Sequence, residues 1–154
     1  MSGVIESIFV AQRHGEPQHA VDGANLTAAV GLEGDRYAGK GVVSLIEAEA
    51  VERFNARTGL NIRPEQTGRN LVTRGVALNP LVGKRFQLGD ALVEGFELCD
   101  PCAKLGARLA TDAVSPRAIV KTFLESAGLR VRVLSSGPIT PGTPIVAFAH
   151  SPDL

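Results

Sequence analysis

Two cysteines, Cys99 and Cys102, have the residue type and spacing in this sequence that most clearly point to chemistry. They stand where an apolar stretch with strand character meets a stretch predicted to be helical. Amides at the start of a helix favour a thiolate on Cys102, and Lys104 and Arg108 add positive potential. A disulfide between two such close residues would close too small a loop to stabilise a fold, so in a reducing compartment the pair indicates chemistry rather than scaffold.

Other roles are open to these thiols. Cysteines also fill space in cores, and the alternation of the preceding strand favours burial of Cys99 for packing alone, which leaves Cys102 as the working thiol. A thioredoxin-like dithiol redox pair is an alternative, although the βαβ frame around it is missing. A zinc site is a further alternative and needs two more ligands, for which His14 and His19 have a suitable spacing; the remaining histidine is His150.

Two polar groups outside the cysteine segment could hold a ligand. Asp35 and Arg36 follow Gly34 in a glycine-rich stretch, where a carboxylate, a guanidinium and free backbone amides suit a polar ligand. Arg69 and Asn70 place a bidentate donor beside an amide, which suits a phosphate or the edge of a pterin. The same residue types also close loops through salt bridges and caps, so each pair has a structural interpretation as well.

The elements expected to position these residues are short and mostly strands. Apolar or alternating stretches predict strands at residues 4–10, 42–46, 85–88, 91–98, 129–133 and 145–148. Strands outnumber the predicted helices and are not regularly interleaved with them, so we expect a mostly antiparallel β-barrel with a few peripheral helices. Residues 1–154 are of a length normal for one domain, and we expect a single domain.

Three helices are expected around this barrel. Ser44 begins a capping box ahead of a helix that should end near Gly59. A short helix follows the cysteines at residues 103–109. Ser115 provides the cap of a third helix, which carries Leu124 on its apolar face and should continue until the next glycine.

Charge and hydropathy limit the classes of partner. Sixteen Lys and Arg balance sixteen Asp and Glu, so no global charge favours nucleic acid or an acidic membrane surface, and any anion binding must be local. No apolar run approaches the ~18 to 20 residues of a membrane-spanning helix. The first residues lack the basic and apolar regions of a secretion signal. We therefore expect a cytoplasmic protein without nucleic-acid or membrane partners.

Five segments, in this order, resemble the MOSC domain, the C-terminal module of molybdenum-cofactor sulfurases that also occurs as a stand-alone protein. The segments are 31–36 (GLEGDR), 68–76 (GRNLVTRGV), 81–90 (LVGKRFQLGD), 101–105 (PCAKL) and 131–142 (VRVLSSGPITPG). The resemblance covers most of the chain and implies a strand-rich barrel. Two positions depart from the family pattern: Arg69 stands where many members have Glu, and Thr143 where many have Asp.

The resemblance also implies a function. The family's Pro-Cys cysteine, here Cys102, is thought to carry sulfur as a persulfide or to contact the molybdenum of the cofactor. The residues that the resemblance and the polar groups above assign to binding molybdopterin are Gly34, Asp35, Arg36, Arg69, Asn70 and Lys104. Sulfur would come from a partner such as a cysteine desulfurase or pass to a molybdoenzyme. The family is associated with pyridoxal phosphate, but we expect none to be bound by this chain.

Three function classes follow. The first is a stand-alone MOSC-like domain that binds molybdenum cofactor, or a related ligand, or carries sulfur on Cys102. The second is a dithiol redox protein that uses Cys99 together with Cys102. The third is a non-catalytic interaction domain whose cysteines only pack. The sequence leaves open whether the domain acts as a sulfurtransferase, supports a cofactor-dependent reaction, or only binds.

Overall fold

The computed structural model describes residues 2–148 of the 154-residue chain. Its strands are β1 (Ser2–Val10), β2 (His19–Val21), β3 (Ala24–Thr27), β4 (Gly31–Leu32), β5 (Val42–Glu47), β6 (Leu71–Arg74), β7 (Arg85–Leu88), β8 (Ala91–Leu98), β9 (Leu129–Ser135), β10 (Gly137–Ile139) and β11 (Pro144–Ala147). Its helices are α1 (Ala48–Thr58), α2 (Ala103–Leu109) and α3 (Pro116–Thr122), with short 3₁₀ turns η1 (Pro64–Thr67) and η2 (Asn79–Leu81).

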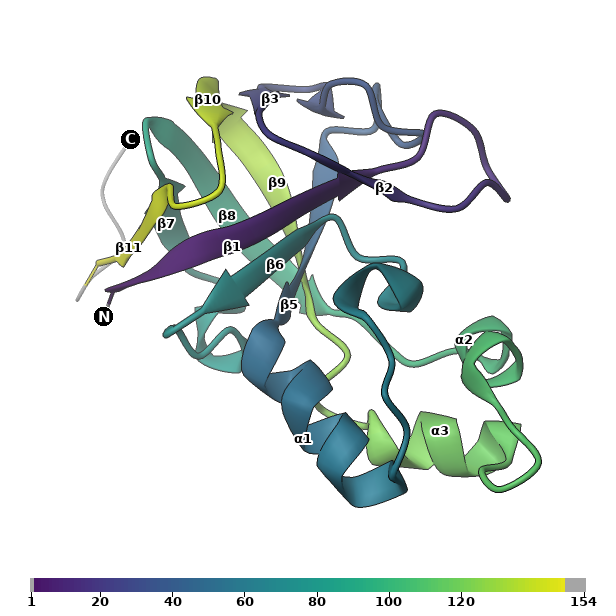
Figure 1. Cartoon of the computed structure of the whole chain (residues 1–154). Helices are drawn as coiled ribbons and strands as arrows, with labels where there is room; N and C mark the ends of the chain where they lie inside the picture. Colours follow the sequence, from purple (N-terminus) through teal and green to yellow (C-terminus); the bar gives the residue numbers. More distant parts are fainter. Residues whose placement is uncertain (1, 149–154) are drawn as a thin grey trace.

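Most of the strands form a barrel. The order is β11-β7-β8-β9-β5-β6-β1, and pairing of β11 with β1 closes it. β2 pairs with β1 outside the ring, and β10, β3 and β4 form a small separate sheet. The helices gather at the end of the barrel opposite this small sheet (Figure 1). The expectation of a strand-rich barrel with peripheral helices is confirmed.

One strand pair departs from the antiparallel pattern. β5 and β6 run parallel, whereas the other pairs in the ring are antiparallel. Parallel neighbours need a crossover connection, and α1 lies in the segment that joins these two strands. This arrangement leaves one face of β5 and β6 turned toward the helices.

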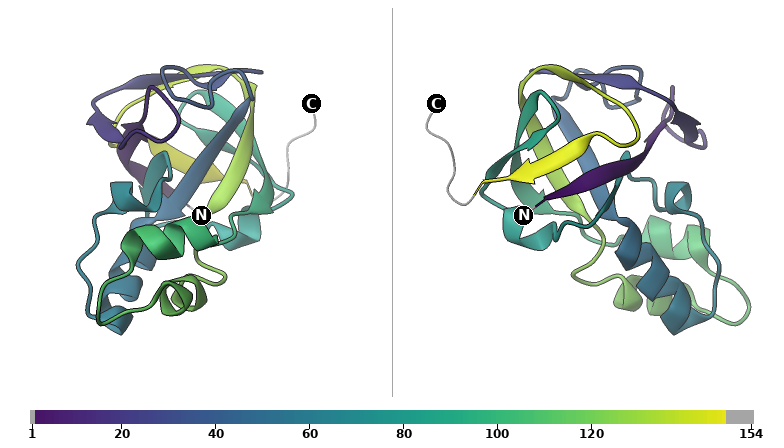
Figure 2. Two further views of the ribbon diagram at one scale, coloured as in Figure 1. Left: turned by 90° about the vertical axis from the view of Figure 1, so that its right-hand side faces the viewer. Right: turned by 60° about the vertical axis from the view of Figure 1, so that its left-hand side comes forward.

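Two apolar clusters hold the fold together. Alternating side chains fill the barrel interior, for example Ile5, Leu71 and Phe86, each with no exposed surface. A second cluster lies between the barrel wall and the helices, where the rings of Phe54 and Phe123 stack with centroids 4.2 Å apart. α2 and α3 pack side by side in this region (Figure 2). In the described part of the chain, no helix has the length and apolar character needed to cross a membrane.

Two helix predictions were wrong in detail. Ser44 does not cap a helix; it lies within β5, which leads directly into α1 at Ala48. The capping-box spacing was present, but Ser44 pairs with Arg130 of β9, and pairing with β6 continues the strand to Glu47. α1 does end at Gly59 as predicted, with a φ of 75°.

The third helix is shorter than predicted. α3 ends at Thr122, because Phe123 turns into the core and Glu125 adopts a φ of 66°, which is incompatible with a continuing helix. Leu124 consequently lies at the surface with 58% of its area exposed, rather than on a buried face. The N-cap of α3 is Ser115, as predicted, and its hydroxyl accepts a hydrogen bond from the Ala118 amide at 3.2 Å.

Candidate functional site

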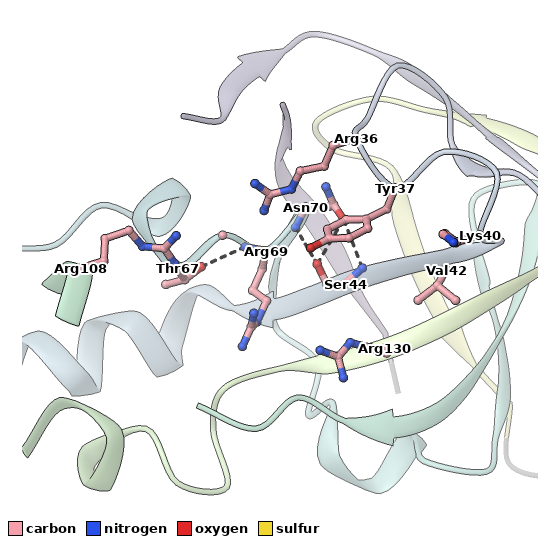
Figure 3. A pocket seen from close by; sticks show the side chains of 11 residues that line it. Arg36, Tyr37, Lys40, Val42, Ser44, Thr67, Arg69, Asn70, Arg108 and Arg130 are labelled. Atoms are coloured by element: carbon pink, nitrogen blue, oxygen red, sulfur yellow. Dashed lines mark hydrogen bonds between the residues drawn. The ribbon is translucent and has the colours of Figure 1, made fainter. Parts of the chain in front are cut away.

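A cationic pocket of about 230 Å³ lies where the 36–40 loop, β5, the start of β6 and α2 approach one another (Figure 3). Its lining consists of Arg36, Tyr37, Lys40, Val42, Ser44, Thr67, Gly68, Arg69, Asn70, Arg108 and Arg130. Five of these side chains are cationic, and none of these lining residues is acidic. Such a surface attracts anions.

The arginines are held in place by contacts that leave donors available. Arg69 donates from Nε to the carbonyl of Ala127 at 2.8 Å. The Arg36 guanidinium lies 5.1 Å from the centre of the Tyr37 ring. The guanidinium of Arg108 lies against Gly68, where an added Cβ would come within 3.2 Å of it. These contacts bring three guanidinium groups toward one region of the pocket.

Electrostatic repulsion accompanies this convergence. Burial lowers the pKa of Arg108, and the like charges of Arg36 and Arg69 lower it further. The shift indicates that the groups lie close enough to repel one another. An anion bound among them would relieve the repulsion, and guanidinium groups suit phosphate because they can donate two hydrogen bonds in parallel.

Asn70 and Ser44 form the floor of the pocket and clamp three strands together. The side-chain oxygen of Asn70 accepts a hydrogen bond from the Ser44 hydroxyl at 3.2 Å, and its Nδ2 donates to the carbonyl of Phe9 at 3.1 Å. The Ser44 hydroxyl in turn accepts from the Asn70 amide at 3.1 Å. Asn70 is only 4% exposed. Its polar atoms are therefore engaged in structure, and the residue shapes the pocket wall.

Three of the predicted ligand-binding residues lie outside the lining. Asp35 is buried, and its carboxylate accepts hydrogen bonds from the amides of Ala11 at 3.0 Å and Tyr37 at 3.3 Å. It thereby fixes the loop that presents Arg36. Gly34, which precedes Asp35, permits the turn there because it adopts a φ of 85°. Lys104 is exposed on α2 and does not line the pocket.

The two cysteines differ in environment. Cys99 is 3% exposed and belongs to the cluster between barrel and helices, and burial raises the pKa of its thiol. Cys102 is exposed and immediately precedes α2. The amide of Leu105 lowers the pKa of the Cys102 thiol most, and the Lys104 amide acts in the same direction, while partial burial opposes them. Both amides act as backbone hydrogen-bond donors that stabilise the thiolate form of Cys102.

Cys102 does not line the pocket but lies beside it. The positive charge of Arg69 helps to lower the pKa of Cys102. The Cys102 thiolate in turn raises the pKa of Arg108, which burial lowers. The Cys99 amide donates a hydrogen bond to the carbonyl of Gly128 at 2.8 Å. Gly128 follows Ala127, whose carbonyl accepts the hydrogen bond from Arg69. The Cys102 thiol and the cationic pocket thus have two arginines in common, Arg69 and Arg108.

Sequence reasoning missed part of this pocket. Lys40 and Arg130 were not singled out, although both line it. Arg130 reaches the pocket because β9 pairs with β5 in a register that puts it opposite Ser44, which a single sequence does not reveal. The alternation of arginines in β9 was the available signal.

The described residues give no support to the zinc alternative. His14 is exposed and its ring meets that of Tyr37 edge-on, with centroids 4.9 Å apart. Residues 2–148 contain no group of three or more His, Cys, Asp or Glu side chains placed to hold a metal ion. His150 lies outside the described residues.

Comparison with known proteins identifies the family. A model of the MOSC domain matches residues 12–146. The chain belongs to the MOSC domain family. This membership agrees with the barrel and with the order of the five segments. A comparison with curated proteins finds no match.

Solved structures show the same fold. The YuaD protein of Bacillus subtilis is 19% identical, with 94% of each chain covered and a TM-score of 0.83. YiiM of Geobacillus stearothermophilus is 23% identical, with 95% of this chain and 75% of that chain covered and a TM-score of 0.73. YiiM of Escherichia coli is 22% identical, with 100% and 73% covered and a TM-score of 0.72. At these identities the likeness concerns the fold.

Proposed function

We propose that this MOSC domain binds the molybdenum cofactor, with an anionic phosphate of the cofactor in the cationic pocket and the Cys102 thiolate toward the metal. The observation that carries the proposal is the sharing of Arg69 and Arg108 between the pocket and the thiol. A phosphate suits guanidinium donors, and a thiolate is a soft ligand suited to a soft metal centre. The bound cofactor would supply the metal chemistry.

The residues of the chain would divide the work. Arg69 would bind the phosphate, and the charges of Arg69 and Arg108 would keep Cys102 ionised. Asn70 and Ser44 would keep the pocket floor rigid, because their side chains are already bonded to each other. Gly34 and Asp35 would act indirectly by holding the loop that carries Arg36. Lys104 would contribute mainly through its backbone amide.

Cofactor loading tests the proposal. The full chain would be produced in cells that make the molybdenum cofactor, and molybdenum and pterin would be measured in the purified protein. We expect both in the wild type, loss of molybdenum in Cys102→Ser, and loss of both in Arg69→Gln. The matched control Cys99→Ser should retain both, because Cys99 is buried away from the pocket lining. Equal molybdenum in wild type and Cys102→Ser would contradict the role of the thiolate.

A second candidate, sulfur transport, is favoured by the exposure of Cys102 and the lowered pKa of its thiol. The thiolate would attack the outer sulfur of a donor persulfide, the sulfur–sulfur bond would break, and the donor would leave as a thiolate. Cys102 would then carry the persulfide. Incubation with a cysteine desulfurase and cysteine, followed by intact mass measurement, should add one sulfur to the wild type and none to Cys102→Ala.

The buried Cys99 makes the dithiol alternative the weaker one. Its thiol is 3% exposed and its pKa is raised by burial, which disfavours the thiolate that disulfide exchange needs. Sulfur acceptance that is unchanged in Cys99→Ser would leave a resolving role for this residue without support.

A further inference from the structure

A second cavity of about 310 Å³ adjoins the cationic pocket. It is bounded by the loop from Gly15 to Gln18 and by residues around η1, and it shares Arg36, Gly68 and Arg108 with the first pocket. Arg36 and Arg108 therefore stand at a junction between an inner cationic pocket and an outer cavity. A ligand held by these two residues has space on both sides.

The positive charge of the inner pocket exceeds what one phosphate compensates. Among its five cations, only Arg130 has a carboxylate partner in the described structure, Glu97 at 2.8 Å. The other four have no carboxylate partner among the described residues, whereas a phosphate monoester carries about −1.5 to −2 at neutral pH. Lys40 and Arg108 lie at opposite ends of the pocket, with Arg69 and Arg130 between them (Figure 3). The cations thus extend over more than one phosphate position.

The outer cavity has a different chemistry. Arg63 is already paired with Glu65, with Nε and Oε1 2.6 Å apart, and the rest of the wall includes Glu16, Gln18 and Gln66. This mixture of carboxylates and amides suits an uncharged polar group that both donates and accepts hydrogen bonds. Glu65 is neutralised by Arg63, and the charge of Glu16 disfavours a further phosphate beside it.

The junction also contains unsatisfied polar atoms. Arg36 Nε and Gln18 Oε1 are buried and have no hydrogen-bond partner. The Gln18 amide is oriented by its Nε2, which donates to the carbonyl of Gly68 at 3.2 Å, so the free oxygen is an acceptor. Unpaired buried polar groups are rare, so these two atoms are available to bond with a ligand at the junction.

We infer that the two cavities form one site for a diphosphate ester. One phosphate lies between Arg69 and Arg130, the second lies between Arg36 and Arg108, and the polar organic remainder extends into the outer cavity. The inference rests on the proposed function in assigning an anion to the inner pocket, and it deepens that proposal by naming the class of ligand.

Calorimetric titration of the full chain at low ionic strength tests this inference with three probes: inorganic phosphate, pyrophosphate and ADP. We expect pyrophosphate to bind at least about tenfold more tightly than phosphate, because the second phosphate gains two charge-assisted contacts. ADP should bind no more weakly than pyrophosphate, because its nucleoside fits in the outer cavity. Phosphate and pyrophosphate of equal affinity would overturn the inference.

Variants separate the two phosphate positions. Arg69→Gln should weaken both phosphate and pyrophosphate, whereas Arg36→Gln and Arg108→Gln should remove most of the advantage of pyrophosphate. Arg57→Gln, an exposed residue of α1 outside both linings, is the matched control and should change neither. Circular dichroism of each variant establishes that it is folded. Equal losses for both probes in Arg36→Gln and in Arg108→Gln would overturn the assignment of a second phosphate position.

These results are distinguishable from failure of the proposed function. A chain that prefers pyrophosphate to phosphate but acquires no molybdenum in cells would refute cofactor binding and retain the diphosphate site. A chain that acquires molybdenum but binds pyrophosphate no better than phosphate would retain the proposed function and refute this inference. Absence of binding by all three probes would overturn the inference as well.

Discussion

Arg69 Nε donates a hydrogen bond to the carbonyl of Ala127 at 2.8 Å, which anchors the guanidinium at the edge of the pocket. The next residue, Gly128, accepts a hydrogen bond from the amide of Cys99. An added Cβ at Gly128 would lie 2.2 Å from the carbonyl oxygen of Leu45, so the approach of this segment to β5 requires glycine. The two hydrogen bonds connect Arg69 of the cationic pocket to the segment that carries Cys99 and Cys102.

The first prediction concerns the ionisation of Cys102. The Leu105 amide contributes most to its lowered pKa, and the positive charge of Arg69 contributes in the same direction. A lowered pKa means that the thiolate persists to lower pH than in an ordinary cysteine. Arg69→Gln should therefore raise the midpoint of the pH dependence of Cys102 alkylation, measured with iodoacetamide and peptide mass spectrometry. Arg63→Gln, which is exposed and paired with Glu65, should leave the midpoint unchanged.

The second prediction concerns the difference between the two thiols. Brief alkylation of the native protein near neutral pH should modify Cys102 and spare Cys99, because Cys99 is buried and its pKa is raised. Both thiols should react after unfolding in guanidinium chloride. Native alkylation of Cys99 at a rate similar to that of Cys102 would show that the helix region opens readily and would revive the dithiol alternative.

The sequence predicted the order of strand, cysteine pair and helix around Cys99 and Cys102 because each of these signals is local. The strand that ends near Leu98, the helix that begins at Ala103 and the pair of cysteines are adjacent in sequence, and the structure has them in that order. Lys40 and Arg130 were missed because the 36–40 loop and β9 come to one pocket only through the pairing of β5 with β9. Pairing over such separations depends on the whole barrel, and the pattern of a single strand does not specify it.

Ser44 illustrates how tertiary structure overrides a local motif. Its spacing from Glu47 matches a capping box, but the capping interaction competes with a strand ladder on both sides of β5. The ladder prevails, and the hydroxyl bonds with Asn70 instead of a helix amide. The prediction failed because Asn70 is distant in sequence from Ser44.

The third prediction concerns the stability of the pocket floor. Asn70→Ala removes the side-chain bonds to Ser44 and to the Phe9 carbonyl in a buried position. Leaving buried polar partners unpaired costs about 1–3 kcal/mol, so the free energy of unfolding in urea should fall by about that amount. Asn61→Ala, at an exposed loop position, is the control and should change it by less than about 0.5 kcal/mol. Similar losses of unfolding free energy in both variants would show that Asn70 does not hold the strands together.

The fourth prediction compares two neighbouring residues at the end of α3. Phe123 has no exposed surface and stacks on Phe54, whereas Leu124 is 58% exposed. Phe123→Ala should therefore lower the free energy of unfolding by about 3–5 kcal/mol, through lost burial and the cavity that remains. Leu124→Ala should change it by less than about 0.5 kcal/mol, because the side chain is already in water. Had α3 continued as the sequence predicted, both residues would share an apolar face. A large loss in Leu124→Ala would thus place the helix end further along the chain, whereas two very different values would support termination at Thr122.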